Sequence, residues 1–330
     1  MITRISSSFL LPDCPYHHQA LNLEKMTKSL EQEKQLLERL LPSHAADHLR
    51  RGATMEPMTH KDVTLFFSDV VGFTSISKEL YPWQVIEMIN TLYLVMDHIA
   101  IKFGLFKCEI IGDAYICCSG LPKPDKNHAK KVANFAIAVI HACKHVLSPV
   151  DGKPLQLRIG LNTGSCASGI VGAAMPRYTV FGDTVNVTAR HESTGVPGKI
   201  HISETCKDAL QEHEGFQVTE RGLIEMKGKG EMRTYFLEVE EETNRWVSQA
   251  ALAKLDEEIV LLLNDESKQV ELSSRRRSVN MSAMAGLNAS VTTATKALMR
   301  ASATKSSFHL PSASLISEFN ASWCADVEEE

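Results

Sequence analysis

The chain has 330 residues, 44% of them hydrophobic and 23% charged, so it can bury one full domain core and still leave flanking segments. Its formal net charge of −5 provides no global basic field, which argues against nucleic acid as a partner. The eight cysteines form no CxxC pair, and no apolar run approaches the roughly 20 residues of a membrane span. We therefore expect one folded domain with reduced thiols, in the cytoplasm.

The N-terminal segment changes character after residue 20. Residues 1–20 mix Ser, Pro and His without periodicity and predict a disordered lead. Residues 21–52 space apolar side chains by three and four among Glu, Lys and Gln, which predicts a short coiled coil that Pro42 ends, then a further short helix before Gly52. The apolar positions are Leu23, Met26, Leu30, Leu37 and Leu40. The alternative is a single amphipathic helix that packs on the domain's own core.

A run of β-branched and aromatic residues from Val63 predicts a core strand that stops at Asp69. Gly72 then allows a tight turn, and Thr74 or Ser75 is placed to cap a helix. A carboxylate at the open end of a strand, with its backbone neighbours, suits a hard cation. The alternative is that Asp69 only caps the turn.

The next elements alternate between helical and extended periodicity. They are a helix over 82–103, a strand over 105–111, a Gly112–Asp113 turn, a strand over 114–118, a helix over 128–146 and a strand over 155–161. The order strand, helix, hairpin, helix, strand predicts a ferredoxin-like α+β core with an antiparallel sheet backed by helices. The hairpin would carry a carboxylate at its tip.

Glycines at 164, 169 and 172 predict a β-rich turn region with close backbone approaches. Residues 181–190 then predict a turn that leads into a helix, with Asp183 or Thr184 as its cap. Asn186 and Arg190 are four residues apart, so they share a helical face where an amide and a guanidinium can converge on one anionic ligand. A merely solvated face is the alternative.

The C-terminal half of the domain contains a short strand over 200–202 and a hairpin over 216–237 with a basic turn, Lys227-Gly228-Lys229-Gly230. Such a turn can hold phosphates or can simply be exposed. Beyond Glu238 the composition predicts a mostly disordered, Ser-rich tail over 241–330, with a helix over 244–263.

Taken together, residues 63–76, 109–115, 175–195 and 227–236 resemble, in order, the signatures of class III nucleotide cyclase catalytic domains, especially those of eukaryotic guanylate cyclases. The resemblance covers about residues 60–240 and implies the cyclase homology fold, with a further C-terminal hairpin. The heptad segment resembles the helical linker that pairs such domains in receptors.

The resemblance also implies a role for each matched residue. Asp69, the backbone of Val70, and Asp113 match the ligands of two Mg²⁺ or Mn²⁺ ions, which would assist attack of the ribose 3′-oxygen on the α-phosphate. Arg190 matches the arginine that stabilises the α-phosphate in the transition state, and Asn186 matches the residue that orients the ribose. Arg158 and Lys227 match the groups that bind the β- and γ-phosphates.

The residues matched to base recognition follow two patterns. Glu109 matches the guanylate pattern and can accept from guanine N1–H and N2–H, and Arg177 matches it as well. Thr179 stands where guanylate cyclases usually carry Cys, and its hydroxyl can serve guanine or adenine. The substrate expected is GTP, with an adenylate or dual-specificity cyclase as the alternative.

In this family the two half-sites come from different subunits. The metal acids lie on one, and the base, ribose and Arg groups lie on the other, and this chain contains both sets. The resemblance therefore implies a homodimer through the catalytic domain and the coiled coil, regulated by an upstream sensor or receptor domain. The chain would then be cytoplasmic or the cytosolic part of a membrane receptor. The alternative from another class is a non-catalytic regulatory subunit.

Overall fold

The computed structural model describes residues 17–52, 55–172, 175–239 and 247–265. The chain divides into two units, Met1–Leu263 and Asn264–Glu330, and nearly all described residues belong to the first. Most of the expected disordered lead (1–16) and most of the Ser-rich tail (241–246 and 266–330) lie outside the described residues. None of the described helices is long and apolar enough to cross a membrane.

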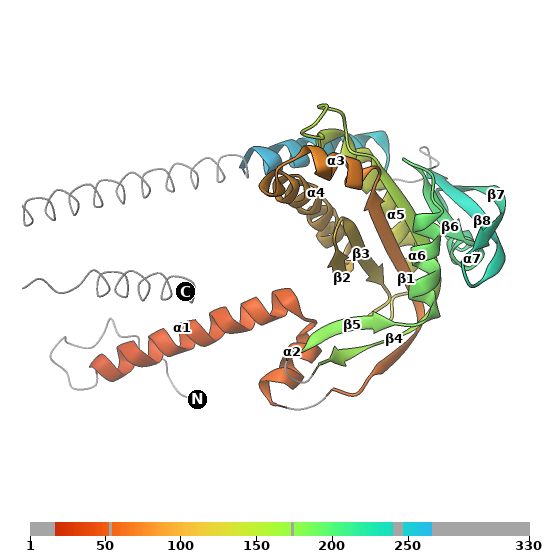
Figure 1. Ribbon diagram of the computed structural model, residues 1–330. Helices are drawn as coiled ribbons and strands as arrows, with labels where there is room; N and C mark the ends of the chain where they lie inside the picture. Colours follow the sequence, from red (N-terminus) through yellow and green to blue (C-terminus); the bar gives the residue numbers. More distant parts are fainter. Residues whose placement is uncertain (1–16, 53–54, 173–174, 240–246, 266–330) are drawn as a thin grey trace, which may run out of the picture. The chain divides into compact units, whose positions relative to one another are not determined.

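Eight strands form one sheet (Figure 1). Seven of them follow the order β2-β3-β1-β4-β6-β8-β7, and the eighth, β5, pairs with residues 167–171 of β4. All pairs are antiparallel except β4 with β6. The strands are β1 Met58–Val70, β2 Phe106–Ile111, β3 Ala114–Ser119, β4 Leu157–Val171, β5 Arg177–Phe181, β6 Ile200–Ser203, β7 Phe216–Met226 and β8 Gly230–Val239. The predicted mixed α+β fold with a mostly antiparallel sheet is confirmed.

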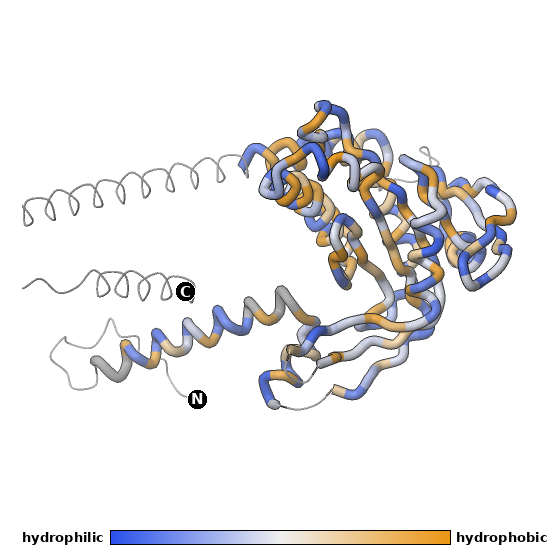
Figure 2. Tube along the Cα trace, viewed as in Figure 1, coloured by the Kyte–Doolittle hydropathy of each residue, from blue (hydrophilic) through white to orange (hydrophobic). Residues whose placement is uncertain are grey.

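Helices cover both faces of this sheet. The main core lies between one face and α4 (Pro82–Phe103), α5 (His128–Ala142) and α7 (Glu204–Gln211), and a one-turn helix at Cys143–His145 follows α5. The opposite face carries α6 (Asp183–Ser193) and a smaller core to which α2 (Ser43–Arg50) contributes Ala45. Figure 2 shows many apolar residues on α4 and α5, the two long helices that contribute most of the helical side chains of the main core.

Helix α4 begins and ends at the residues that the sequence predicts. Pro82 occupies its first turn, where a missing N–H costs nothing, and Gln84 accepts a hydrogen bond from the Tyr81 backbone N–H at 3.0 Å. Gly104 closes it with a φ of 64°, in the left-handed region. The helix is therefore held in register against the sheet and supports the β2–β3 hairpin that follows.

Helix α1 (His17–Leu40) starts four residues before the expected linker. Leu23, Met26 and Leu30 on it are 60–65% exposed in the single chain. Helix α2 packs on the small core, where the His44 ring meets the Tyr178 ring edge-on at 5.7 Å. The helices exist as predicted, whereas their pairing as a coiled coil stays a prediction.

Two local predictions are wrong. Strand β4 runs from Leu157 to Val171 and does not end at residue 161, because the chain stays extended through Gly164 and Gly169 and does not turn there. A Cβ added at Gly164 would lie 2.7 Å from the Thr184 hydroxyl oxygen, so this glycine makes room for a close neighbour within the strand. Neither predicted helix cap is used: α3 (Phe73–Glu79) follows Gly72, and α6 follows Gly182, with no side-chain cap in either case. The Thr184 hydroxyl donates to the Ser165 carbonyl instead.

A last helix spans residues 249–265, which overlaps the range expected for a helix, 244–263. Val247, Leu255 and Ile259 are buried in the main core. The Asp256 carboxylate accepts hydrogen bonds from His141, Lys144 and His145 at the end of α5. The folded unit thus includes a helix beyond the last strand of the sheet.

Candidate active site

Two carboxylates meet where β1 ends. Strand β1 pairs with β3 through Ser68 and Tyr115, so the tip of the β2–β3 hairpin lies beside Asp69. Gly112 makes that tip with a φ of 64°, and the Val70 backbone N–H donates to the Asp113 Oδ2 at 3.2 Å. The predicted metal residues Asp69, Val70 and Asp113 are therefore brought together from two separate segments.

The pKa of Asp113 reflects how close the two carboxylates lie. Burial, and then the neighbouring Asp69 carboxylate, raise the pKa of Asp113 to about 6. The Tyr93 hydroxyl donates to the Gly112 carbonyl at 3.0 Å, which holds the hairpin tip against α4. Two carboxylates this close favour either a shared proton or a cation between them.

Arg158 lies beside the acids, directly across the β1–β4 ladder from Asp69. Its Nη2 forms an ion pair with Asp69, and its Nε donates to the Glu192 Oε1 at 3.3 Å. Burial and then the charge of Asp69 raise the pKa of Glu192 to about 7, although Arg158 opposes the shift. Sequence reasoning missed Glu192. The only feature of the sequence that could have indicated Glu192 is its position on α6. Because it follows Arg190 by two residues, it lies on the opposite side of the helix, toward the sheet.

A glycine allows α6 to reach this position. A Cβ added at Gly160 on β4 would lie 2.2 Å from the Glu192 backbone nitrogen and 2.7 Å from the Thr188 carbonyl oxygen. No larger residue fits there without moving the helix, so Gly160 lets α6 lie directly on the strand. The same contact delivers Glu192 to Arg158.

The other face of α6 carries Asn186 and Arg190. Asn186 is exposed and Arg190 half-buried, whereas the neighbouring Val187, Thr188 and His191 are buried. Among the described residues, no hydrogen bond or ion pair involves either side chain, so both are available to a ligand. One helix therefore presents Glu192 to the acids of its own chain and presents the two predicted ribose and phosphate groups outward.

The predicted base residues lie on two strands that contact each other, β2 and β5. Glu109 is exposed on β2, one residue after a bulge at Cys108, and the Phe106 and Tyr178 rings pack edge-on at 5.6 Å between the strands. Tyr178 is buried, so Arg177 and Thr179 on either side of it point away from the small core.

The basic turn between β7 and β8 is fastened to α6 by its second lysine. Lys229 forms an ion pair with Asp183, at the first residue of the helix. Lys227 is exposed and remains available. In the described part of the chain, no polar contact joins Lys227, Asn186, Arg190 or the base residues to the Asp69–Asp113 pair.

The donor set fits a hard divalent cation. Two carboxylates and a backbone turn supply oxygen ligands, and the remaining positions suit substrate phosphates and water. No group of three or more His, Cys, Asp and Glu residues in the described ranges could hold a metal ion.

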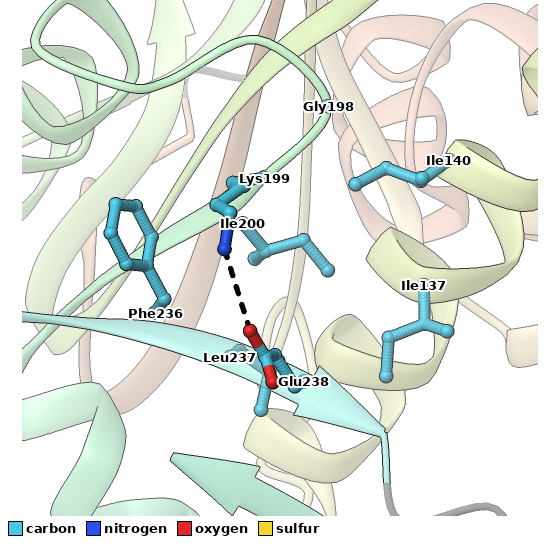
Figure 3. A pocket seen from close by; sticks show the side chains of 8 residues that line it. All are labelled: Ile137, Ile140, Gly198, Lys199, Ile200, Phe236, Leu237 and Glu238. Carbon is cyan, nitrogen blue, oxygen red and sulfur yellow. Dashed lines mark hydrogen bonds and ion pairs between the residues drawn. The ribbon is translucent and has the colours of Figure 1, made fainter. Parts of the chain in front are cut away.

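A separate apolar groove lies between α5, β6 and β8 (Figure 3). Its polar side chains are occupied: the Lys199 Nζ lies 3.5 Å from Glu238 and stacks over the Phe236 ring. None of the predicted site residues lines it. Its lining residues are Ile137, Ile140, Gly198, Lys199, Ile200, Phe236, Leu237 and Glu238.

Comparison with known proteins places the chain in one family. The family described as adenylate and guanylate cyclase catalytic domain matches residues 55–239. The chain is 45% identical over 219 residues to human guanylate cyclase soluble subunit beta-2, covering 65% of this chain and 35% of that protein. It is also 45% identical over 230 residues to human atrial natriuretic peptide receptor 2, covering 66% and 22%. The chain thus spans about a third or less of these relatives.

The solved guanylate cyclase domain of RhGC from Catenaria anguillulae, in complex with GTP, superposes with a TM-score of 0.53 at 37% identity. The alignment covers 55% of this chain and 98% of that domain. The chain belongs to the class III adenylate and guanylate cyclase catalytic domain family. Within that family it is a nucleotide cyclase domain related to guanylate cyclases, and the family is generally metal-dependent.

Proposed function

We propose that this protein is a guanylate cyclase that converts GTP to 3′,5′-cyclic GMP and pyrophosphate. The observation that carries the proposal is the meeting of Asp69 and Asp113 at the end of β1, with the Asp113 carboxylate on the Val70 N–H. Such an acid pair beside an arginine is what ribose attack on an α-phosphate requires.

Each of the proposed site residues has a separate role. Asp69, the Val70 backbone and Asp113 would hold two Mg²⁺ or Mn²⁺ ions, which when bound supply Lewis-acid activation of the 3′-hydroxyl and neutralise phosphate charge. Arg158 and Lys227 bind the β- and γ-phosphates. Asn186 orients the ribose. Arg190 donates to the charge that develops on the α-phosphate, which is worth most in the transition state.

Guanine selection rests on Glu109. A carboxylate accepts from guanine N1–H and N2–H, whereas beside adenine N1 it would be an unpaired charge. Arg177 and Thr179 on β5 complete the base-reading strands, and 45% identity to human guanylate cyclase soluble subunit beta-2 supports the same substrate. Thr179 keeps a dual GTP and ATP specificity as the second candidate, because a hydroxyl both donates and accepts.

Among the residues that the structure describes, no polar contact joins the acids to the outward groups of α6, and we propose that a second copy completes each site. We place residues 60–240 in the catalytic domain and residues 21–52 in a linker that pairs as a coiled coil and receives a signal from an upstream sensor. The six described cysteines are free thiols, which supports a cytoplasmic location, either of the whole protein or of a receptor's cytosolic part.

The test is to incubate purified chain with GTP or ATP and Mg²⁺ or Mn²⁺ and to quantify both cyclic nucleotides. Cyclic GMP formation that is lost in Asp69→Asn supports the proposal. Cyclic AMP at a comparable rate would replace it with dual specificity, and inactivity with both substrates and both metals would favour a regulatory subunit.

A further inference from the structure

Arg158 has two acidic partners, and it reaches them through different nitrogens. Its Nη2 pairs with Asp69, whereas its Nε donates to Glu192. Because a guanidinium offers five donors in a fixed plane, it can give up one carboxylate and keep the other. The side chain of Glu192 is 14% exposed and that of Asp69 is 22% exposed, so Glu192 is the more enclosed partner.

The positions of both partners are set by the backbone. Asp69 and Arg158 face each other in the β1–β4 ladder, and α6 is held on β4 at Gly160, where the helix backbone approaches within contact distance. Neither carboxylate can follow the guanidinium far. Arg158 is shared between both acids in this structure, and Glu192 remains within its reach if the contact with Asp69 is lost.

The shared state conflicts with a metal ion. A divalent cation that binds Asp69 and Asp113 competes for the Asp69 carboxylate, whose Oδ2 Arg158 already contacts, and it repels the guanidinium at that distance. Arg158 must then leave Asp69, yet it is needed nearby for the phosphates of the nucleotide.

We propose that Arg158 is an internal counter-ion that occupies Asp69 in the metal-free protein, and that Glu192 is the positioning residue that retains Arg158 beside the site when a divalent cation displaces it. This inference rests on the proposed function, because it takes Asp69 and Asp113 as the metal ligands. Glu192 does not touch the metal or the substrate in this scheme. It lowers the free energy needed to displace Arg158 from Asp69.

The test is Mn²⁺ binding to the nucleotide-free full chain, measured by the electron paramagnetic resonance signal of free Mn²⁺. Asp69→Asn identifies the site by the binding that it removes. Arg158→Met, which keeps the bulk without the charge, should tighten binding about five-fold, and Glu192→Gln should weaken it about five-fold, the scale of a partly exposed ion pair. Glu192→Asp keeps the charge at a shorter reach and should fall between wild type and Glu192→Gln.

The double variant separates positioning from simple charge. If Glu192 acts through Arg158, Glu192→Gln should change Mn²⁺ binding much less in the Arg158→Met background than in the wild type. Equal weakening in both backgrounds would overturn the inference, as would weaker binding in Arg158→Met. Absence of any Mn²⁺ binding that depends on Asp69 would overturn it too, whereas cyclic GMP formation, assayed separately, would still decide the proposed function.

Discussion

At the scale of single residues, the site is defined by carboxylates whose environments differ. The pKa values of Asp113 and Glu192 are both raised above their ordinary values, chiefly by burial. Arg158 lies among these acids and contacts both Asp69 and Glu192. Keeping these carboxylates ionised in the metal-free chain is therefore energetically unfavourable, and a bound cation would lower this free energy.

This cost predicts a pH dependence of stability. The pKa of Asp113 rises from 3.8 to about 6 on folding, so the folded chain binds more protons than the unfolded chain between about pH 4 and 6. The free energy of unfolding of metal-free protein should therefore fall as the pH rises through that window. Asp113→Asn, which keeps an oxygen for the Val70 N–H, should flatten the fall and add on the order of 1 kcal/mol at pH 7.5 after solvent screening.

Urea unfolding in EDTA at a series of pH values measures this effect. Asp208→Asn, at an exposed position, is the control and should leave the slope unchanged. A slope in Asp113→Asn as steep as that of the wild type would contradict the prediction.

A second residue-scale prediction concerns the base. Glu109→Lys replaces the acceptor for guanine N1–H with an ammonium donor, which can serve adenine N1. We expect cyclic GMP formation to drop at least about ten-fold, the usual result of an unpaired polar group at a reading site, and the ratio of cyclic AMP to cyclic GMP to rise. Chromatography of the products from equal GTP and ATP decides it, and an unchanged ratio would remove Glu109 from base recognition.

At the scale of elements, α6 is the structural link of the site, because it rests on β4 at Gly160 and carries groups on both of its sides. Gly160→Ala should push α6 off the strand and destabilise the fold by about 2 kcal/mol or more, as overpacking does in dense cores. Gly169→Ala on the same strand meets its nearest atom, the Pro57 Cα, at 3.4 Å and should cost little. Comparison of the two urea midpoints checks the prediction, and equal midpoints would contradict it.

The helix over 249–265 gives an element-scale prediction outside the catalytic sheet. Ile259 is fully buried in the main core, whereas its neighbour Val260 is 45% exposed. Ile259→Ala should therefore lower the free energy of unfolding by about 2 to 4 kcal/mol through the cavity it leaves, and Val260→Ala should change it little. Thermal unfolding measures both, and similar losses would mean that the helix does not dock as described.

At the scale of the whole molecule, the question is whether one chain suffices. No polar contact links Asp69 to Arg190 among the described residues. If sites are shared between two copies, Asp69→Ala and Arg190→Ala chains should each be inactive alone, and their mixture should regain up to about a quarter of the wild-type activity, because one hybrid site keeps both halves.

Cyclic GMP formation after co-refolding or co-expression measures this complementation. Mixing Asp69→Ala with Asp113→Ala is the matched control. Both changes lie in the same half-site, so no hybrid site is intact. Failure of the first mixture to exceed the second would count against shared sites.

Sequence alone determined the elements whose information is local. The span of α4 follows from Pro82, Gly104 and the apolar periodicity between them, and the Gly112–Asp113 hairpin follows from turn chemistry. The candidate site residues followed from short ordered motifs. What local pattern could not show is how far β4 continues, because glycines in a strand and glycines in a turn look alike until their neighbours are known.

Only the tertiary structure decided what surrounds each site residue. Asp69, Asp113 and Arg158 come from three distant segments, and their contact depends on strand pairing that no window of sequence contains. Glu192 was missed for the same reason. Its role depends on which side of α6 faces β4, and that is set by close packing at Gly160, a long-range contact between two backbones.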